Sequence, residues 1–503
     1  MSMMKIGWAE SVLIDESNKK ISLAGQFAER ISEYVEKPLT TTAMAVECDG
    51  EQMIMVSTDL VGVSYNLVEA IRAKLADNDL GIDVNKVIIS AIHTHTGPVY
   101  PRGQLQAKVA TNSGSFRALL ESQLPAGRKY VESAPVSANP EIASNEEVFE
   151  ILVEKISEVI VNSWKNLAPG SFSNAFGRAA VGMCRRVSYS DGSAQMWGDA
   201  NTAVFTQLEG GNDSGIELLY VFNEAGKLTG IVPNLACPAQ CVQHRLFVSP
   251  DFWGETKKLL REHFGEDLYM LPLCSAAGDQ CPVDLVCWVD PYTDVHDPNL
   301  KRDNPPKRKA DPSMFDLDGM KKAGKRVANE IIEVYNEGLD APQADIEFVH
   351  HVHNMQLPIR RATLSDVAMA KKVIREYLND HPGDVDYNDA AALQVYLGII
   401  KRFKVQELME TLDTEVHIIK MGTIAFATNP FELFLDYGNQ IKARAKCEQT
   451  FLVQLANGTE GYLPTEKAEL GGHYSAFIAS GQVGHVGGDQ LVRETLKDIN
   501  SLF

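Results

Sequence analysis

The 503-residue sequence lacks several features that would point directly to a function. It has no run of eighteen apolar residues, which argues against a membrane-spanning helix. Its 47 Lys and Arg residues are outnumbered by 67 Asp and Glu, so we expect no electrostatic binding of nucleic acid or anionic lipid. Eight cysteines are too few for a disulfide scaffold in so long a chain, and the first ten residues lack the apolar core of a signal peptide. We therefore expect a cytoplasmic protein.

Motifs of several common enzyme classes are also missing. No Gly-x-Gly-x-x-Gly follows an expected strand, and the sequence has neither a P-loop nor a Gly-x-Ser-x-Gly element. What remains is an ordinary globular composition, 45% hydrophobic and 23% charged, in which expected strands and helices alternate without an internal repeat. We predict an α/β fold in which residues 1–503 form a single large domain, with central mixed β-sheets flanked by helices. Surface excursions are expected near 99–145 and 286–315.

Hydrophobic spacing and turn residues predict the individual elements. Asp49-Gly50 separates two apolar runs and is a typical hairpin turn, and Gly265 marks the end of an amphipathic helix. The expected strands are 40–47, 53–58, 86–92, 216–222, 228–232, 268–273, 346–357, 416–421, 423–427 and 451–455. The expected helices are 66–76, 146–167, 252–264, 320–334, 364–378, 390–412, 431–443 and 489–502.

The most informative segment is His93-Thr94-His95, which follows an apolar strand and precedes Gly97-Pro98. Residues i and i+2 of a strand share one face, so both imidazoles are expected to point into the same space. Gly97-Pro98 then ends the strand and leaves the pair at its open end. Two neighbouring imidazoles suit a metal ligand beside an acid or base.

Polar residues follow other expected strands as well. Asp279 and Cys281 come after 268–273, Glu432 comes after 423–427, and Tyr462 and Tyr474 lie beyond 451–455. Ligand sites of α/β sheets collect at strand ends, so these residues would form a site if their strands ended together.

Two other groups of metal-type side chains are interpreted as structural. Cys237 and Cys241, with His244, lack the second pair that a structural zinc site needs, and the cysteines are expected to be free thiols in the core. His350, His351 and His353 alternate along an expected half-buried strand.

Taken in chain order, these segments resemble the catalytic domain of neutral (alkaline, non-lysosomal) ceramidases, zinc-dependent amidases that cleave the N-acyl bond of ceramide. The resemblance covers nearly the whole chain. Its specific parts are His93-Thr94-His95-Thr96-Gly97-Pro98 and the tyrosine pair of Gly461-Tyr462-Leu463-Pro464-Thr465 and Tyr474. Supporting parts are Val56-Ser57-Thr58-Asp59-Leu60, Cys184-Arg185-Arg186, the turn from Ser275 to Pro282, and Asn429-Pro430-Phe431-Glu432.

The resemblance implies a role for each matching residue. His93, Glu432 and Tyr462 would be zinc ligands, and His95, Arg185 and Tyr474 would surround the scissile carbonyl. Zinc bound in this way keeps a position for water and lowers the pKa of that water towards about 7. His95 would then carry the proton to the leaving amine, while Arg185 and Tyr474 would stabilise the oxyanion.

The sequence also departs from the family pattern. The family supplies a second zinc histidine where this chain has Pro238, which cannot bind a metal. His244 is the nearest imidazole and is expected to replace that ligand, with Gln240 as a weaker substitute. Cys281 stands where the family has a serine, so a thiol could bind a hydrogen-bond partner or a metal there. The chain ends where the family's immunoglobulin-like domain would begin, which suggests a divergent bacterial paralogue.

These observations predict a zinc-dependent hydrolase that uses metal-activated water to cleave an amide or related bond. The acidic composition favours a small, soluble, polar substrate over ceramide. Two alternatives stay open. One is glycosidase or lyase chemistry that uses Asp251, Asp279 or Glu432 as acid and base. The other is a binding protein with a decayed site. The oligomeric state is left open.

Overall fold

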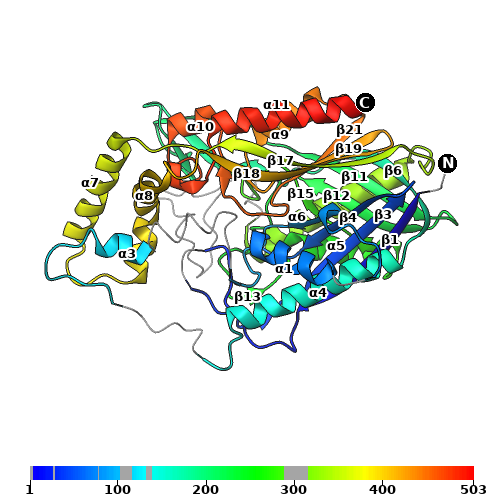
Figure 1. The fold of residues 1–503 in the computed structure, drawn as a ribbon, viewed down its shortest axis with the longest axis horizontal. Helices are drawn as coiled ribbons and strands as arrows, with labels where there is room; N and C mark the ends of the chain where they lie inside the picture. The colour runs from blue at the N-terminus through cyan, green and yellow to red at the C-terminus, as the bar shows by residue number, and fades with distance from the viewer. Residues whose placement is uncertain (1–3, 27–28, 77–78, 102–115, 132–138, 288–314) are drawn as a thin grey trace.

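Two stacked β-sheets form the centre of the computed structural model, which describes residues 4–26, 29–76, 79–101, 116–131, 139–287 and 315–503 (Figure 1). Within these residues the larger sheet has nine strands, most of them antiparallel, with parallel pairs near both edges. In spatial order they are β14 (Tyr269–Met270), β12 (Leu228–Leu235), β11 (Gly215–Asn223), β6 (Ala168–Arg178), β1 (Lys5–Ile14), β3 (Leu39–Cys48), β4 (Glu51–Thr58) and β5 (Val87–Ala91), while β15 (Leu273–Cys274) also pairs with β12.

The second sheet carries the C-terminal part of the chain. Its strands are, in order, β17 (Phe348–Pro358), β18 (Thr411–Met421), β19 (Ile424–Thr428) and β21 (Gln449–Val453). β17, β18 and β19 are antiparallel neighbours, and β19 pairs with β21 in parallel.

The alternation of side chains along the strands produces the layers. On β3, Ala43 and Ala45 face the helices, whereas Met44 and Val46 join a core shared by the two sheets. On β18, Ile418 faces the helices of its own layer and Ile419 faces the other sheet. Successive residues of a strand point to opposite faces, so each apolar strand stabilises two interfaces at once. The result is a four-layer arrangement of helices, two sheets and helices.

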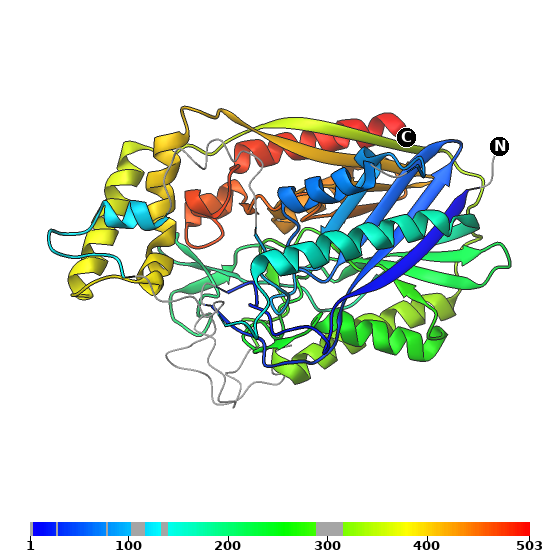
Figure 2. The same ribbon diagram turned by 60° about the horizontal axis from the view of Figure 1, so that its bottom comes forward.

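Helices cover both outer faces. α1 (Tyr65–Ala76) and α4 (Asn145–Lys165) lie side by side on the larger sheet, as do α5 (Phe252–Phe264) and α6 (Asp316–Glu337) (Figure 2). α9 (Leu435–Arg444) and α11 (His485–Leu502) cover the second sheet. At the left of Figure 1, α3 (Phe116–Glu121), α7 (Leu364–Asp380) and α8 (Tyr387–Val405) form a helical lobe with its own core.

Short elements join these layers. Besides β14 and β15, the two-residue strands among the described residues are β2 (Tyr34–Val35), β7 (Met183–Cys184), β13 (Phe247–Val248), β16 (Gln280–Cys281), β20 (Glu432–Leu433) and β22 (Tyr462–Leu463). The others are β8 (Arg186–Tyr189), β9 (Ala194–Met196), β10 (Phe205–Leu208), α10 (Glu466–Gly471) and the 3-10 helices η1 (Val84–Lys86) and η4 (Ile478–Ser480).

The predicted α/β class with mixed sheets and flanking helices is confirmed. The Asp49-Gly50 turn is also confirmed: both residues have positive φ and join β3 to β4. The helix expected over 252–264 has the bounds of α5.

Several predicted elements differ from the structure in their bounds or continuity, among them the following three. The helix expected over 390–412 ends at Val405, and the chain enters β18 at Thr411. The strand expected over 268–273 is split at Leu271-Pro272, where proline has no N–H to donate to a neighbouring strand. The helix expected from 431 begins at Leu435, because Glu432 first pairs with the chain at Gly461.

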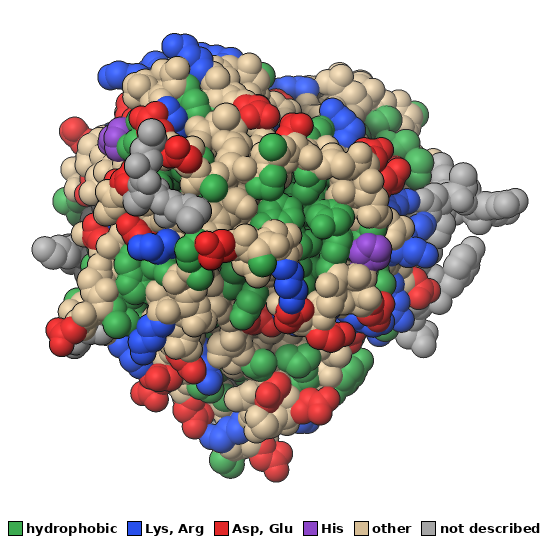
Figure 3. All heavy atoms as spheres, turned by 90° about the vertical axis from the view of Figure 1, so that its right-hand side faces the viewer, with side chains coloured by type: hydrophobic (Ala, Val, Ile, Leu, Met, Phe, Trp, Pro, Cys, Tyr) green, Lys and Arg blue, Asp and Glu red, His purple; other side chains and the backbone are tan. Residues whose placement is uncertain are grey.

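The expected excursions near 99–145 and 286–315 include residues 102–115, 132–138 and 288–314, which lie outside the described residues. Part of the first excursion is not a surface loop, because α3 buries Leu119 and Leu120 in the core of the helical lobe. None of the described helices is both long and apolar enough to cross a membrane. On the face in Figure 3, acidic and basic side chains are interspersed around apolar ones, so this face offers no single-sign patch for a polyanion.

Candidate functional site

The candidate site lies where strands of the two sheets end together. Asn457, which follows β21, accepts a hydrogen bond from the Ile89 N–H of β5 through Oδ1 (2.8 Å) and donates its own N–H to the Ile89 carbonyl (2.9 Å). The Gln454 N–H donates to the Cys274 carbonyl at the end of β15 (3.0 Å). These bonds hold the segment after β21 against β5 and the end of β15, so residues far apart in sequence meet in one place.

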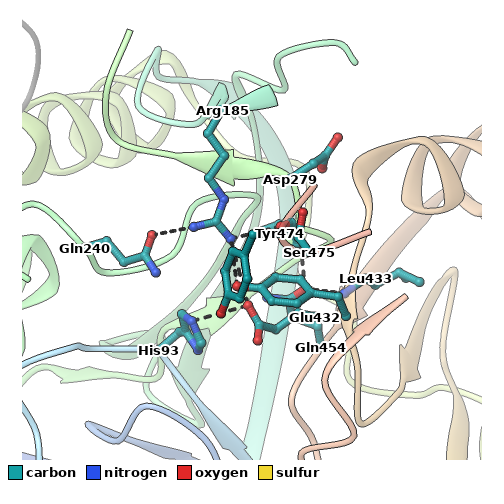
Figure 4. A network of polar contacts seen from close by, with 12 residues as sticks. His93, Arg185, Gln240, Asp279, Glu432, Leu433, Gln454, Tyr474 and Ser475 are labelled. Carbon is teal, nitrogen blue, oxygen red and sulfur yellow. Dashed lines mark hydrogen bonds and ion pairs between the residues drawn. The ribbon is translucent and has the colours of Figure 1, made fainter. Parts of the chain in front are cut away.

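His93 is oriented by its backbone and by a hydrogen bond to its ring. It has a φ of 65°, a left-handed conformation that turns the chain away from the strand direction after β5. Nδ1 lies 2.6 Å from the Val61 carbonyl oxygen, which can only accept, so the ring carries its proton on Nδ1. Nε2 therefore presents a lone pair, and it lies 3.6 Å from Oε2 of Glu432 (Figure 4).

His95 points its Nε2 at the same place. This atom lies 3.2 Å from the His93 Nε2 and 2.7 Å from the amide nitrogen of Gln240. The amide oxygen of Gln240 accepts a hydrogen bond from Arg185 (3.0 Å), which fixes the amide so that its nitrogen donates to His95. Two imidazole nitrogens with lone pairs thus face each other beside a carboxylate. A cation bound between these groups would offset the repulsion among them.

Glu432 and Tyr462 are brought together by strand pairing. They are register partners in the parallel pair β20–β22, and the Glu432 N–H donates to the Gly461 carbonyl (2.9 Å). The turn at Gly278 comes so close that a Cβ atom there would lie 2.3 Å from the Glu432 carbonyl oxygen. Glycine at 278 is therefore required for this contact.

Arg185 places a permanent charge beside these groups. It is 2% exposed, and its guanidinium donates to Gln240 and to the Gly278 carbonyl (2.9 Å). The same group lies 3.5 Å from the Tyr462 hydroxyl and 3.9 Å from Oε2 of Glu432. Burial opposes its charge, but Tyr462 and Glu432 outweigh this and raise the pKa of Arg185.

Tyr474 lies on a strained loop that Arg186 stabilises. His473 and Ser475, on either side of it, have φ values of 70° and 71°. Arg186 is fully buried, forms an ion pair with Glu209, and donates to the Tyr474 carbonyl (2.9 Å). The Tyr474 ring meets the Tyr462 ring edge-on, with centroids 5.5 Å apart. Burial and the charge of Glu432 raise the pKa of Tyr474 to about 12, so its phenol is protonated at neutral pH.

The structure places His244 and Cys281 against other partners. His244 stacks on Phe315, with ring centroids 4.5 Å apart, and its Nε2 lies 3.4 Å from the Asp316 carboxylate. The Cys281 thiol donates to the Val283 carbonyl (3.2 Å), and burial raises its pKa to about 12. Neither contact involves the histidine pair.

The other two candidate carboxylates are engaged by backbone N–H groups. Asp251 accepts from Phe252 (2.7 Å) at the start of α5 and from Val242 (2.9 Å). Asp279 accepts from Leu435 (2.9 Å) at the start of α9. Burial raises the pKa of each to about 6. These contacts give the two aspartates structural roles, and Glu432 is the carboxylate that contacts the histidine pair.

A cavity of about 300 Å³ opens beside these groups. His95, Arg185, Tyr462 and Tyr474 line it, together with further residues of which the sequence had indicated only Gln240. Those residues are Gly25, Gln26, Met196, Trp197, Gln240, Gln243, Ala391, Ala392, Gln394, Val395 and His473. The wall from α8 carries no motif, so only the fold reveals it, whereas Gln240 was marked by its place near Pro238.

A second group of metal-type side chains lies elsewhere. Within the described residues, His351, His353 and Asp498 can each offer a donor atom so that these atoms all lie within 4.8 Å of one another. We call this group the surface cluster. It lies between β17 and α11 and shares no residue with the site around His93.

Comparison with known proteins identifies the fold. No protein-family model matches the sequence, and no curated protein matches it. Among solved structures, the neutral ceramidase from Pseudomonas aeruginosa is similar, with a TM-score of 0.64 and 14% identity over 99% of this chain and 74% of that one. A ceramidase complexed with C2 is similar too, with a TM-score of 0.65, 13% identity, and coverage of 99% and 75%. The chain therefore has a neutral-ceramidase-like fold, as the sequence resemblance predicted.

Proposed function

We propose that this chain, with its ceramidase-like fold, is a metal-dependent hydrolase that cleaves an amide or related bond in a small polar substrate. One observation carries the proposal. Nε2 of His93 lies 3.6 Å from the Glu432 carboxylate, and the buried Arg185 guanidinium lies 3.9 Å from that carboxylate and 3.5 Å from the Tyr462 hydroxyl, beside a cavity.

The donor set fits a zinc ion. Nitrogen and oxygen ligands bind zinc at about 2.0–2.2 Å, which separates neighbouring ligands of a tetrahedral site by roughly 3.3–3.6 Å. The 3.6 Å between Nε2 of His93 and Oε2 of Glu432 matches this spacing. The hydrogen bond from Nδ1 of His93 to Val61 fixes the tautomer that leaves Nε2 available, as is usual for metal-binding histidines.

A zinc ion bound by His93, Glu432 and Tyr462 would supply a Lewis acid and lower the pKa of water. Around it, the chain contributes donors for the carbonyl oxygen of a substrate. Arg185 brings a fixed positive charge, and Tyr474 brings a protonated hydroxyl. Such preorganised donors stabilise the charge that develops in acyl transfer.

His95 is suited to move a proton. Gln240 donates to its Nε2, so this nitrogen is an acceptor in the resting site. Arg30 donates to the His95 carbonyl (2.7 Å), and a Cβ atom on Gly25 would lie 2.4 Å from the ring. The ring is therefore confined to one orientation at the cavity, where a general base must lie within hydrogen-bond reach of its substrate.

The cavity favours a polar substrate. Four glutamines line it (Gln26, Gln240, Gln243 and Gln394), beside aromatic side chains and the apolar side chains of α8. Amide groups both donate and accept hydrogen bonds, so they complement hydroxyl or amide groups better than an acyl chain. A cavity of about 300 Å³ suits a small molecule such as an N-acylated sugar or amino acid.

The test uses the full chain and a panel of small N-acyl sugars, N-acyl amino acids and simple amides, with and without chelator. We expect hydrolysis that chelator removes and zinc restores. Turnover that is insensitive to chelator would instead support carboxylate chemistry. No turnover together with a metal content unchanged by His93→Ala and Glu432→Ala would indicate a binding protein. Both variants are made together with His351→Ala and His353→Ala, so the surface cluster does not contribute to the count.

A further inference from the structure

The surface cluster lies on a face that is otherwise apolar. His351 and His353 occupy alternate positions of β17, opposite Ile418 and Val416 of β18, and Met355 and Leu357 follow them on the same face. These four apolar residues belong to the core that α11 covers. The chain therefore carries two histidines at strand positions where the pattern of this face calls for apolar side chains.

A carboxylate from α11 completes the cluster. Asp498 directs one oxygen to Nδ1 of His351 (3.1 Å) and the other to Nε2 of His353 (2.6 Å). The two imidazole rings lie nearly perpendicular, with centroids 5.6 Å apart. One carboxylate can balance the charge of one imidazolium but not of two. Two neutral imidazoles and one carboxylate, by contrast, are a usual donor set for a divalent metal ion.

We infer that His351, His353 and Asp498 bind a divalent metal ion of the zinc class at a second site, separate from the site around His93. The donor atoms lie within 4.8 Å of one another, and two bonds of about 2.1 Å to one ion span at most about 4.2 Å. Rotation of a partly exposed side chain closes this gap. The His351 side chain is 41% exposed, that of His353 is 45% exposed, and that of Asp498 is 15% exposed.

The exposure of the two histidines also determines how readily the bound ion exchanges with solvent. Three protein ligands leave at least one position for water, and solvent can reach it from the side of the histidines. The bound ion therefore exchanges with the solution. Because the site forms only when α11 lies on β17, the ion binds the folded chain and stabilises this contact. We therefore assign the ion a structural role, in which it links α11 to β17, the edge strand of the second sheet.

The experiment compares zinc binding by the full chain with that of His351→Ala/His353→Ala, by titration calorimetry and by metal analysis after gel filtration. We expect the double variant to bind one zinc ion fewer per chain, whatever number the parent binds. We also expect zinc to raise the melting temperature of the parent by several degrees more than that of the variant. Because the substituted side chains are partly exposed, the variant is expected to fold.

Two further variants make the result specific. Asp498→Asn keeps the shape of the side chain but removes its charge, and we expect at least tenfold weaker binding at this site. His263→Ala/His381→Ala removes two histidines outside the cluster and should bind zinc like the parent. Equal zinc binding by parent and His351→Ala/His353→Ala would overturn the inference, as would an equal loss in the control. Zinc binding at the His93 site is a separate outcome, because it persists in the variant that lacks the surface cluster.

Discussion

The chain contains two His-x-His segments that are each completed by a distant carboxylate, and they differ in every other respect. His93 and His95 are 5% and 8% exposed and meet Glu432, whereas His351 and His353 are about half exposed and meet Asp498. In the first segment the left-handed residue His93 brings the two Nε2 atoms within 3.2 Å and the ring centroids within 4.9 Å. In the second, an undistorted strand keeps the ring centroids 5.6 Å apart. The motif alone therefore does not distinguish a catalytic site from a surface site.

What separates the two segments is the layer of residues behind them. The Val61 carbonyl fixes the tautomer of His93, and the Gln240 amide makes Nε2 of His95 a hydrogen-bond acceptor. Arg185 in turn fixes the orientation of the Gln240 amide. These groups cannot move freely because they are buried. Such outer contacts tune ligands and catalytic groups, and their loss commonly costs ten- to a hundredfold. We therefore propose that the buried segment carries the chemistry and that the exposed one contributes to stability.

The largest expected effect comes from His93→Ala. We expect it to remove the buried metal ion and to lower kcat/KM by about three to four orders of magnitude, because a metal supplies several kcal/mol of transition-state stabilisation. The matched change on the other segment is His351→Ala/His353→Ala, which should leave kcat/KM within about twofold. Steady-state kinetics on a substrate from the panel compares the two. Similar losses from both variants would break the contrast between the segments.

Tyr474→Phe tests the role of the hydroxyl group that the strained loop presents to the cavity. Loss of one donor to the developing oxyanion is expected to lower kcat by about a hundredfold, with little change in KM. Metal content should stay at the level of the parent, which separates this effect from that of His93→Ala. A parallel rise in KM, with kcat preserved, would mean that Tyr474 only binds the substrate.

Gln240→Ala tests the residues behind the histidines. We expect kcat/KM to fall by about ten- to a hundredfold, because His95 and Arg185 both lose a partner. Gln243→Ala, which changes another glutamine of the cavity, is the matched control and should act mainly on KM. If the two variants behave alike, Gln240 is only part of the cavity wall.

Asp251→Asn tests whether burial raises the pKa of a carboxyl group packed behind the His93 segment. Asp251 follows Ser249, whose carbonyl accepts hydrogen bonds from the side chains of Thr94 (2.8 Å) and Thr96 (2.9 Å). Its pKa is raised to about 6 in the folded chain, so between about pH 4 and pH 6 the folded state holds a proton that the unfolded state has released. The contribution of Asp251 to stability is therefore full at low pH and is lost as pH rises through 6, by up to about 3 kcal/mol.

Urea unfolding of both proteins at several pH values measures this. Because Asp251→Asn removes the titrating group, the free energy of unfolding of the parent minus that of the variant should fall between pH 4.5 and pH 7. A constant difference would show that Asp251 has no raised pKa.

The sequence predicted much of the fold and named several residues that the structure brings together beside the cavity, but it did not predict their geometry. Apolar alternation and the Asp49-Gly50 turn were enough for the strands, and strand ends with polar residues indicated His93, Glu432 and Tyr462. The positive φ of His93 was not predictable, since a His-x-His after a strand reads as a continued strand. The pairing of Glu432 with Tyr462 was missed because the helix was expected to begin four residues earlier.

His244 shows that closeness in sequence to Pro238 does not predict which side chain reaches the site. It follows Pro238 by six residues, yet its side chain contacts Asp316 and Phe315, which approach from α6 and the residue before it. Gln240 is the residue of that segment that reaches His95. Which of two neighbouring side chains faces a site depends on contacts made by distant parts of the chain, and no local pattern encodes these.

Anomalous diffraction at the zinc edge, from crystals of the full chain grown with zinc, tests the central claim most directly. We expect a peak within about 2.0–2.2 Å of Nε2 of His93 and of a carboxylate oxygen of Glu432. That peak should be retained in His351→Ala/His353→Ala and lost in His93→Ala. A zinc-loaded crystal whose peak lies only between His351, His353 and Asp498, with none beside His93, would contradict it.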